Sequence, residues 1–197
     1  MNLSQNQISS CANFGGHQEL LTLLLSENKL PNCAGLKSMP KLVELNLNGN
    51  RLTSLKELMQ LDSLKKLDVG KNKLETLADF PSLPALEHFD ASENLIEKDG
   101  EKELAELSNC SNLKTLIMAG NPWVDEKGDD FKKEVLIALD KLSIKQVNDM
   151  EEVTEEEIQE AKTEKQERER ARLEAEEEAR RAAEEAANNP EAEENNE

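Results

Sequence analysis

Asparagines recur along this chain at a constant spacing. Five lie 22 residues apart and a sixth follows after 27 residues, at Asn6, Asn28, Asn50, Asn72, Asn94 and Asn121. Around each stands the same apolar pattern, as in Leu42-x-x-Leu45-x-Leu47-x-x-Asn50-x-Leu52. A repeat of this length is one supersecondary unit, which buries a continuous core only by stacking on its neighbours. The spacing therefore predicts a solenoid.

Each repeat contains two apolar patterns that predict two kinds of local structure. The Leu-x-Leu alternation before each asparagine is typical of a short strand with one buried face. Between strands the apolar residues recur at every third position, as from Leu52 to Leu64, which suits 3₁₀-like turns better than an α-helix. We expect each asparagine amide to bond backbone groups of its own coil and of the adjacent coil, because a buried amide needs such partners.

These patterns predict an α/β fold: a repeat solenoid with short parallel strands on its concave face and 3₁₀ or irregular segments on its convex face. Residues 1–150 hold about six repeats and a C-terminal cap. Phe131 to Leu139 have the spacing of a capping helix, with Asp129 or Asp130 at its N-cap. A short helix is also expected at residues 101–107.

A long charged helix is predicted at residues 151–189, followed by an acidic tail at 190–197. Thr154 and Glu157 fit a capping box, and strong helix formers follow from Glu155 to about Ala187. No sustained heptad appears, so we favour a lone helix, or one laid along a partner, over a self-dimerising coiled coil. Opposite charges four residues apart are expected to pair, at Glu164–Arg168, Arg170–Glu174, Glu176–Arg180 and Glu177–Arg181.

Charge and composition exclude several classes of partner. The formal net charge is −18, which disfavours direct binding to nucleic acid or to an anionic membrane. The sequence has no signal peptide and no apolar run long enough to span a bilayer. Cys11, Cys33 and Cys110 fall at positions that are apolar in other repeats, so we expect buried thiols in a reducing compartment.

The sequence predicts no enzyme and no cofactor or metal site. It has two histidines and no tyrosine. It also lacks a phosphate-binding glycine loop, a metal-ligand pairing and a nucleophile motif.

The predicted function is protein binding. Side chains on the exposed face of each strand line the concave surface, which is extended in folds of this kind. The predicted protein-binding residues are Glu44, Asn46, Lys66, Asp68, His88 and Asp90, with Trp123 as a second anchor near the closing loop. The alternatives are an ordinary solvated sheet face and a core-sealing role for Trp123. Because Met1 to Ile8 already fit a strand, we also expect a partner to cover the N-terminal edge.

The repeat period, the apolar pattern and the closure from Asn121 to Val135 resemble the leucine-rich repeat class named after a protein phosphatase 1 regulatory subunit. Within it, Val135 to Leu142, then Val153 to Glu157 and a long Glu/Arg helix, are similar to ciliary members, such as axonemal dynein light chains and the leucine-rich protein of radial spokes. The resemblance implies a non-catalytic axonemal adaptor in the cytoplasm and cilium. Its partners would be axonemal subunits, bound through the concave face, the N-terminal edge and the C-terminal helix.

An alternative resemblance is to the acidic leucine-rich nuclear phosphoproteins, which bind basic partners such as histones. Their tails are nearly pure Asp and Glu and are disordered, whereas residues 151–189 interleave seven Lys and Arg residues with Ala. No run of four basic residues suggests nuclear import. We therefore favour the axonemal adaptor over a nuclear histone-binding or phosphatase-binding regulator.

Overall fold

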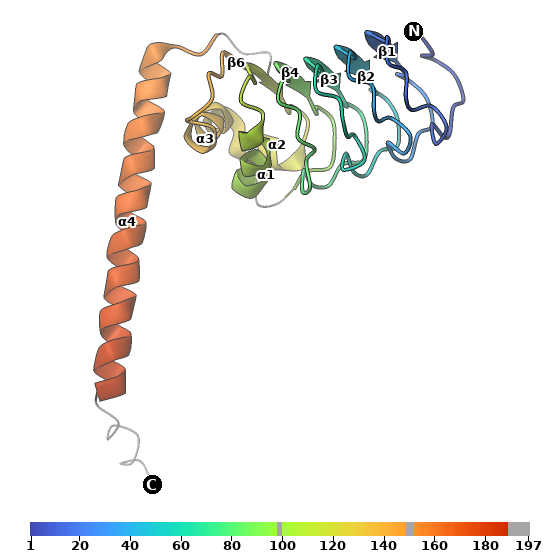
Figure 1. Cartoon of the computed structure of the whole chain (residues 1–197). Coiled ribbons are helices and arrows are strands. Elements are labelled where there is room, and N and C mark those ends of the chain that lie inside the picture. Colours follow the sequence, from blue (N-terminus) through green and yellow to red (C-terminus); the bar gives the residue numbers. More distant parts are fainter. Residues whose placement is uncertain (98–99, 149–151, 189–197) are drawn as a thin grey trace.

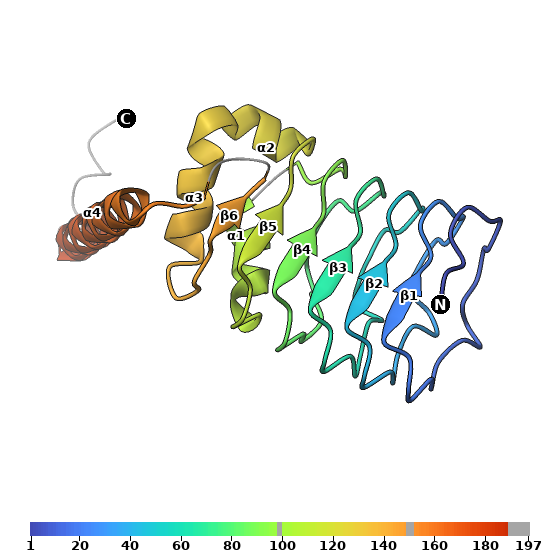
Figure 2. The ribbon, with the colours of Figure 1, turned by 90° about the horizontal axis from the view of Figure 1, so that it is seen from above.

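The computed structural model describes residues 1–97, 100–148 and 152–188. Within these residues, six strands form one parallel sheet in sequence order (Figures 1 and 2). Each strand pairs with the same position of the next coil, as Leu45 does with Leu67, so equivalent residues form straight rows across the sheet. The predicted α/β solenoid is confirmed. The strands are β1 Thr22–Leu24, β2 Glu44–Asn46, β3 Lys66–Asp68, β4 His88–Asp90, β5 Thr115–Ile117 and β6 Gln146–Val147.

Helices occur at the C-terminal end of the solenoid, whereas the N-terminus lies at the opposite end (Figure 1). The α-helices are α1 Gly100–Glu106, α2 Pro122–Lys127, α3 Phe131–Ala138 and α4 Glu155–Asn188, and the 3₁₀ turns are η1 Leu107–Asn109 and η2 Gly128–Asp130. Thr154 and Glu157 form the expected capping box, with reciprocal backbone bonds of 2.8 and 3.2 Å. The expected acidic tail, residues 190–197, lies outside the described residues.

The core is one continuous row of aliphatic side chains running through every coil. The middle residue of each strand from β1 to β5 is fully buried, and so are most leucines of the convex segments. All three cysteines are buried as expected, and burial raises the pKa of the Cys33 thiol to about 12.

A ladder of buried asparagines joins each coil to the preceding one. The Asn72 Nδ2 group donates to the Val69 carbonyl of its own coil at 2.9 Å and to the Leu47 carbonyl of the preceding coil at 3.0 Å. Its Oδ1 atom accepts the Leu52 N–H at 2.9 Å. The same three bonds recur at Asn28, Asn50, Asn94 and Asn121. Both ends of each buried amide are thus satisfied, as predicted.

A left-handed residue precedes every asparagine of this ladder. The backbone has φ of 54° at Glu27, 67° at Gly49, 53° at Lys71, 49° at Glu93 and 72° at Gly120. This conformation turns the chain sharply inward at the end of each strand. Glycine adopts it freely, and three charged residues adopt it at some steric cost.

The convex segments consist of single tight turns. The N–H of Leu58 donates to the carbonyl of Leu55 at 3.0 Å, and Leu64 donates to Leu61 at 3.0 Å. These i→i+3 bonds match the three-residue spacing of the leucines, so the expected 3₁₀-like geometry is present.

The C-terminal edge of the sheet ends differently from the coils before it, in a way that the repeat pattern does not predict. In earlier coils a strand carbonyl accepts the next N–H of the preceding coil, as Asp68 O does from Leu47 N at 2.7 Å. At the last coil the side-chain Oδ1 of Asn148 accepts from Met118 N at 2.7 Å instead. Asn148 has φ of 52°, and its side-chain oxygen takes the place that a strand carbonyl has in the earlier coils.

The cap behind β5 is built around an aromatic pair. Trp123 of α2 packs edge-on against Phe131 of α3, with ring centroids 5.3 Å apart. A Cβ atom at Gly100 would lie 1.8 Å from the Trp123 ring, so only glycine fits there at the start of α1. The predicted N-cap bond of α3 does not form, so this prediction is wrong. Asp130 lies in the turn η2 with helical backbone angles and makes no side-chain cap bond.

Replacing Asn72 with alanine should lower the free energy of unfolding by about 1–3 kcal/mol, because the buried Leu52 N–H loses its acceptor and the Leu47 and Val69 carbonyls each lose one of two amide donors. Asn6→Ala is the matched control: its amide is exposed and donates only to the Leu3 and Ser4 carbonyls of its own coil. Urea unfolding followed by circular dichroism measures both variants. Equal small losses would show that the ladder does not stabilise the stack.

Candidate protein-interaction surface

Six of the seven predicted binding residues lie together on the exposed side of the sheet. We call this surface, made of the first and third residues of β1–β5, the strand face. Its side chains are half-buried or exposed and stand in register from strand to strand. The Lys66 ammonium lies 3.6 Å from the Glu44 carboxylate. Glu44, Asn46, Lys66, Asp68, His88 and Asp90 thus form one continuous polar surface.

The third-position side chains also stabilise the turns that follow their strands. Asp68 Oδ1 accepts the Gly70 N–H at 3.0 Å, and Asp68 Oδ2 accepts from Asn46 Nδ2 at 3.0 Å. Asp90 Oδ1 accepts the Ser92 N–H at 2.9 Å, while Asn46 makes the same turn bond through its amide oxygen. These residues are consequently held in place before any partner arrives.

His88 stands between charges of both signs at the centre of the strand face. Partial burial lowers the pKa of its imidazole, as does Lys66, while Asp90 and Asp68 act in the opposite direction. Since the net shift is downward, the imidazole is neutral at neutral pH and can both donate and accept a hydrogen bond.

Trp123 is not brought together with the other six residues. It is 5% exposed and belongs to the cap, where its ring packs on Phe131. Together with Gly100, Glu101 and Glu126 it borders a hollow of about 480 Å³ on the outside of the cap.

The N-terminal edge of the sheet carries an apolar hollow. Asn2 forms a parallel bridge with Leu24, and Leu3 N donates to Leu24 O at 2.8 Å, so these residues continue the sheet beyond β1. A hollow of about 370 Å³ lies beside them and is bordered by Leu3, Ile8, Cys11, Phe14 and Leu25, among others. A partner at this edge stays a prediction.

Sequence reasoning missed the row of residues that immediately precedes the strands. In this row Leu21 is 57% exposed and Val43 is 36% exposed, although both follow a core leucine. Farther along, Glu87 binds Lys114 at 2.7 Å and Lys65 at 2.9 Å, and these bonds lower its pKa to about 2. The sequence contained a signal for this row, because its positions recur at the same repeat spacing as the strands.

The first half of α4 packs against the cap instead of standing alone, which corrects the predicted lone helix. Ala161 is 1% exposed against α3. The Arg168 guanidinium binds the buried Glu134 carboxylate of α3 with two bonds of 2.9 and 3.0 Å. Two further ion pairs join α3 and α4, Lys132–Glu157 at 2.7 Å and Lys133–Glu164 at 3.0 Å, and Lys165 of α4 pairs with Asp140, just after α3, at 2.8 Å.

Beyond Arg168, α4 extends away from the solenoid (Figure 1). The side chains of residues 169–184 are exposed. Three of the four predicted ion pairs four residues apart form, at Glu164–Arg168, Arg170–Glu174 and Glu177–Arg181. The fourth is wrong: Glu176 pairs with Arg172 at 3.6 Å, and Arg180 with Glu184 at 3.8 Å. Since only Leu173 is a large apolar residue here, this half has no apolar stripe.

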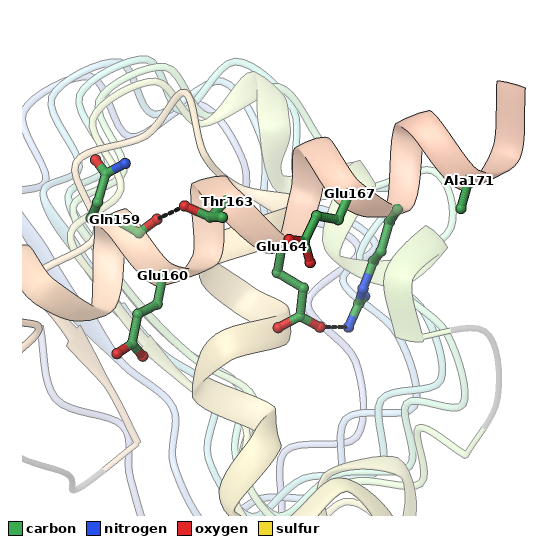
Figure 3. A pocket seen from close by; sticks show the side chains of 7 residues that line it. Gln159, Glu160, Thr163, Glu164, Glu167 and Ala171 are labelled. Carbon is green, nitrogen blue, oxygen red and sulfur yellow. Dashed lines mark hydrogen bonds and ion pairs between the residues drawn. The ribbon is translucent and has the colours of Figure 1, made fainter. Parts of the chain in front are cut away.

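A hollow of about 680 Å³ runs along α4, bordered only by side chains of that helix, including Glu164 and Arg168 (Figure 3). Its open shape and single wall do not resemble an enclosed ligand site. Among the described residues, no group of three His, Cys, Asp or Glu side chains could hold a metal ion. None of the helices in this part of the chain is long and apolar enough to cross a membrane.

Comparison with known proteins identifies the repeat. Residues 40–82 match a family model described as Leucine Rich repeats (2 copies). An internalin from Listeria monocytogenes matches 75% of this chain and 40% of its own, with 20% identity and a TM-score of 0.59. A leucine-rich repeat protein from Leptospira interrogans matches 74% of this chain and 36% of its own, with 29% identity and a TM-score of 0.53.

A third solved structure, the SNF/U2A′ complex of Drosophila melanogaster, has 19% identity and a TM-score of 0.48, over 82% of this chain and 76% of that chain. No curated protein matches the sequence. The chain thus spans well under half the length of the first two structures. It is built of leucine-rich repeats, a fold that serves protein–protein interaction, and the matches indicate no catalytic family.

Acid should release α4 from the cap. Hydrogen bonds from Arg168, Lys132 and Lys133 lower the pKa values of Glu134, Glu157 and Glu164 respectively below the ordinary 4.5. Since these pKa values are depressed on docking, the stabilisation is fully present above pH 4.5 and is lost as pH falls through the lowered values. Hydrogen exchange of the amides of residues 155–168, corrected for the intrinsic pH dependence, measures the release.

Arg168→Met should raise the hydrogen-exchange rate of the same amides at neutral pH by roughly tenfold or more, because it leaves the buried Glu134 without its main partner. Arg170→Met is the matched control, since Arg170 is on the exposed half and pairs only along the helix. If both variants keep wild-type protection, the ion pairs do not hold α4 on the cap.

Proposed function

We propose that this chain is a non-enzymatic scaffold that holds another protein on its strand face. The observation that carries the proposal is the continuous row of polar side chains, half-buried or exposed, that stand in register over β2–β4. Bonds within the sheet and its turns already order Asn46, Asp68 and Asp90. A preordered surface loses little conformational entropy on binding, and this favours recognition of a partner.

We further propose that the scaffold is an axonemal adaptor of cilia or flagella, placed in a radial spoke or a dynein-associated complex. The resemblance of the closing segment and of the long Glu/Arg helix to ciliary members supports this assignment. The helical course of α4 from Glu155 to Asn188 also supports it over the nuclear alternative, whose acidic tails are disordered. In this role α4 and the N-terminal edge would provide additional contacts with axonemal subunits.

The experiment is retention of the tagged full chain in axonemes after detergent removes the membrane. The test variant is Glu44→Arg with Thr115→Arg, which places two long side chains on the strand face. The matched control is Asp62→Arg with Thr53→Arg, which makes the same change of charge at exposed positions outside the strands. We expect the wild type and the control to remain with axonemes, and the test variant to be reduced at least fivefold.

Two results would contradict the proposal in different ways. Recovery of the wild-type chain in the nucleus, with none in axonemes, would refute the axonemal role and favour a nuclear regulator. Equal axonemal retention of both double variants would refute binding through the strand face and would move the contact to α4 or to the N-terminal edge.

A further inference from the structure

Two carboxylates lie side by side at the centre of the strand face. Asp68 and Asp90 occupy the same register position of β3 and β4. Neighbouring strands lie about 4.8 Å apart, so the two side chains are immediate neighbours. Like charges directly opposite each other in a sheet are destabilising. A cation between them would remove this repulsion.

Both carboxylates receive hydrogen bonds from neutral donors alone. Asp68 accepts from Gly70 N, Asn48 Nδ2 and Asn46 Nδ2, and Asp90 accepts from the N–H and hydroxyl of Ser92. In the described part of the chain, neither forms an ion pair with a Lys, Arg or His. Three nearby glutamates do form ion pairs with lysines. Glu44 pairs with Lys66, Glu87 with Lys65 and Lys114, and Glu93 with Lys71. Among these acidic residues, Asp68 and Asp90 therefore stand out as the two without a cationic partner, and both lie at the centre of the strand face.

An arginine side chain is the cation that fits this pair. The described residues provide no third His, Cys, Asp or Glu that would complete a metal site here. A guanidinium group is planar, carries five N–H donors and can donate to two carboxylates at once. The sources of such a group on another protein are exposed arginines.

Two exposed apolar residues, Leu21 and Val43, which we call the apolar step, lie near the carboxylate pair. Leu21 and Val43 are neighbours across the sheet, since Val43 N donates to Leu21 O at 2.8 Å, and both are exposed. Val43 immediately precedes β2, so along the strand direction it lies three residues, about 10 Å, from the level of Asp68 and Asp90, and one to two strand spacings to the side. The separation is therefore roughly 11–14 Å. Side chains two or three turns apart on a helix are separated by about 11–16 Å, so one helical segment can reach both features.

We infer that the strand face binds a protein segment that places an arginine between Asp68 and Asp90 and an apolar side chain on Leu21 and Val43. This inference rests on the proposed protein-binding function and specifies its partner class. The segment is basic and amphipathic, and its apolar end points toward β1. Charge complementarity favours this occupant because the free chain has an unneutralised carboxylate pair at the centre and a net charge of −18.

The test is selection of 16-residue peptides from a random display library on the full chain, followed by fluorescence polarisation with the recovered peptides. We expect them to contain arginine together with Leu, Ile or Phe. Asp68→Asn with Asp90→Asn should weaken their binding at least tenfold. Asparagine keeps the turn bond at both positions, as Asn46 does on β2, and at Asp68 it gives up the bond from Asn46 Nδ2. Asp62→Asn with Asp79→Asn is the matched control, since both residues are exposed outside the strands.

A second pair of variants tests the apolar step. Leu21→Ser with Val43→Thr should weaken the same peptides at least threefold. Leu95→Ser with Met59→Thr, which alters two exposed apolar residues away from the strand face, should leave them unchanged.

Each outcome separates this inference from the proposed function. Recovered peptides that are acidic, or that bind the Asp68→Asn, Asp90→Asn variant as tightly as the wild type, overturn the inference. If such peptides still lose binding to Glu44→Arg with Thr115→Arg, the strand face remains a protein-binding surface. If no peptide is recovered, the inference fails. If peptides are recovered but bind every variant of the strand face as tightly as the wild type, both the inference and the proposed function are contradicted.

Discussion

The asparagine ladder is the interaction on which the rest of this structure depends. Each buried amide bonds its own coil and the preceding coil, so it sets the distance and the register between them. Because every coil obeys the same register, equivalent residues of successive coils line up in rows. Surface side chains such as Lys66 and Glu44 meet their neighbours only through this alignment. The internal bonds of the solenoid therefore determine the pattern of its outer face.

The two ends of the stack show how this arrangement is terminated. At the C-terminal end the repeating backbone bond stops, and the side chain of Asn148 supplies the oxygen that the next carbonyl would have given. The aromatic pair of Trp123 and Phe131 then covers the apolar core, and α4 binds the outer side of α3 through ion pairs. The N-terminal edge instead exposes an apolar hollow beside Leu3 and Phe14.

The sequence was sufficient to predict whatever the repeat itself encodes. Strand positions, buried leucines and the bonds of the ladder follow from side chains that recur at one spacing, and so does the membership of the strand face. The edge strand β6 could not be found, because Val147 and Asn148 stand outside the periodic pattern. Docking of α4 was missed for a different reason: its contacts use charged residues and one alanine, and a charged helix gives no sequence signal of the surface it will meet. The Asp130 cap failed because a turn, η2, directly precedes α3.

Two residues of the strand face carry a charge that the turns following their strands do not require. The third strand position needs an oxygen that accepts the N–H of the following turn. Asn46 supplies it with a neutral amide, whereas Asp68 and Asp90 supply it with carboxylates. The turn is therefore served equally well by an uncharged side chain, and two adjacent negative charges add repulsion without a further bond to the turn. In the described part of the chain, the one bond that uses the second carboxylate oxygen is the bond that Asp68 Oδ2 accepts from Asn46 Nδ2. Since the carboxylates are not required by the turn geometry, their charge is best understood as a property directed at a partner.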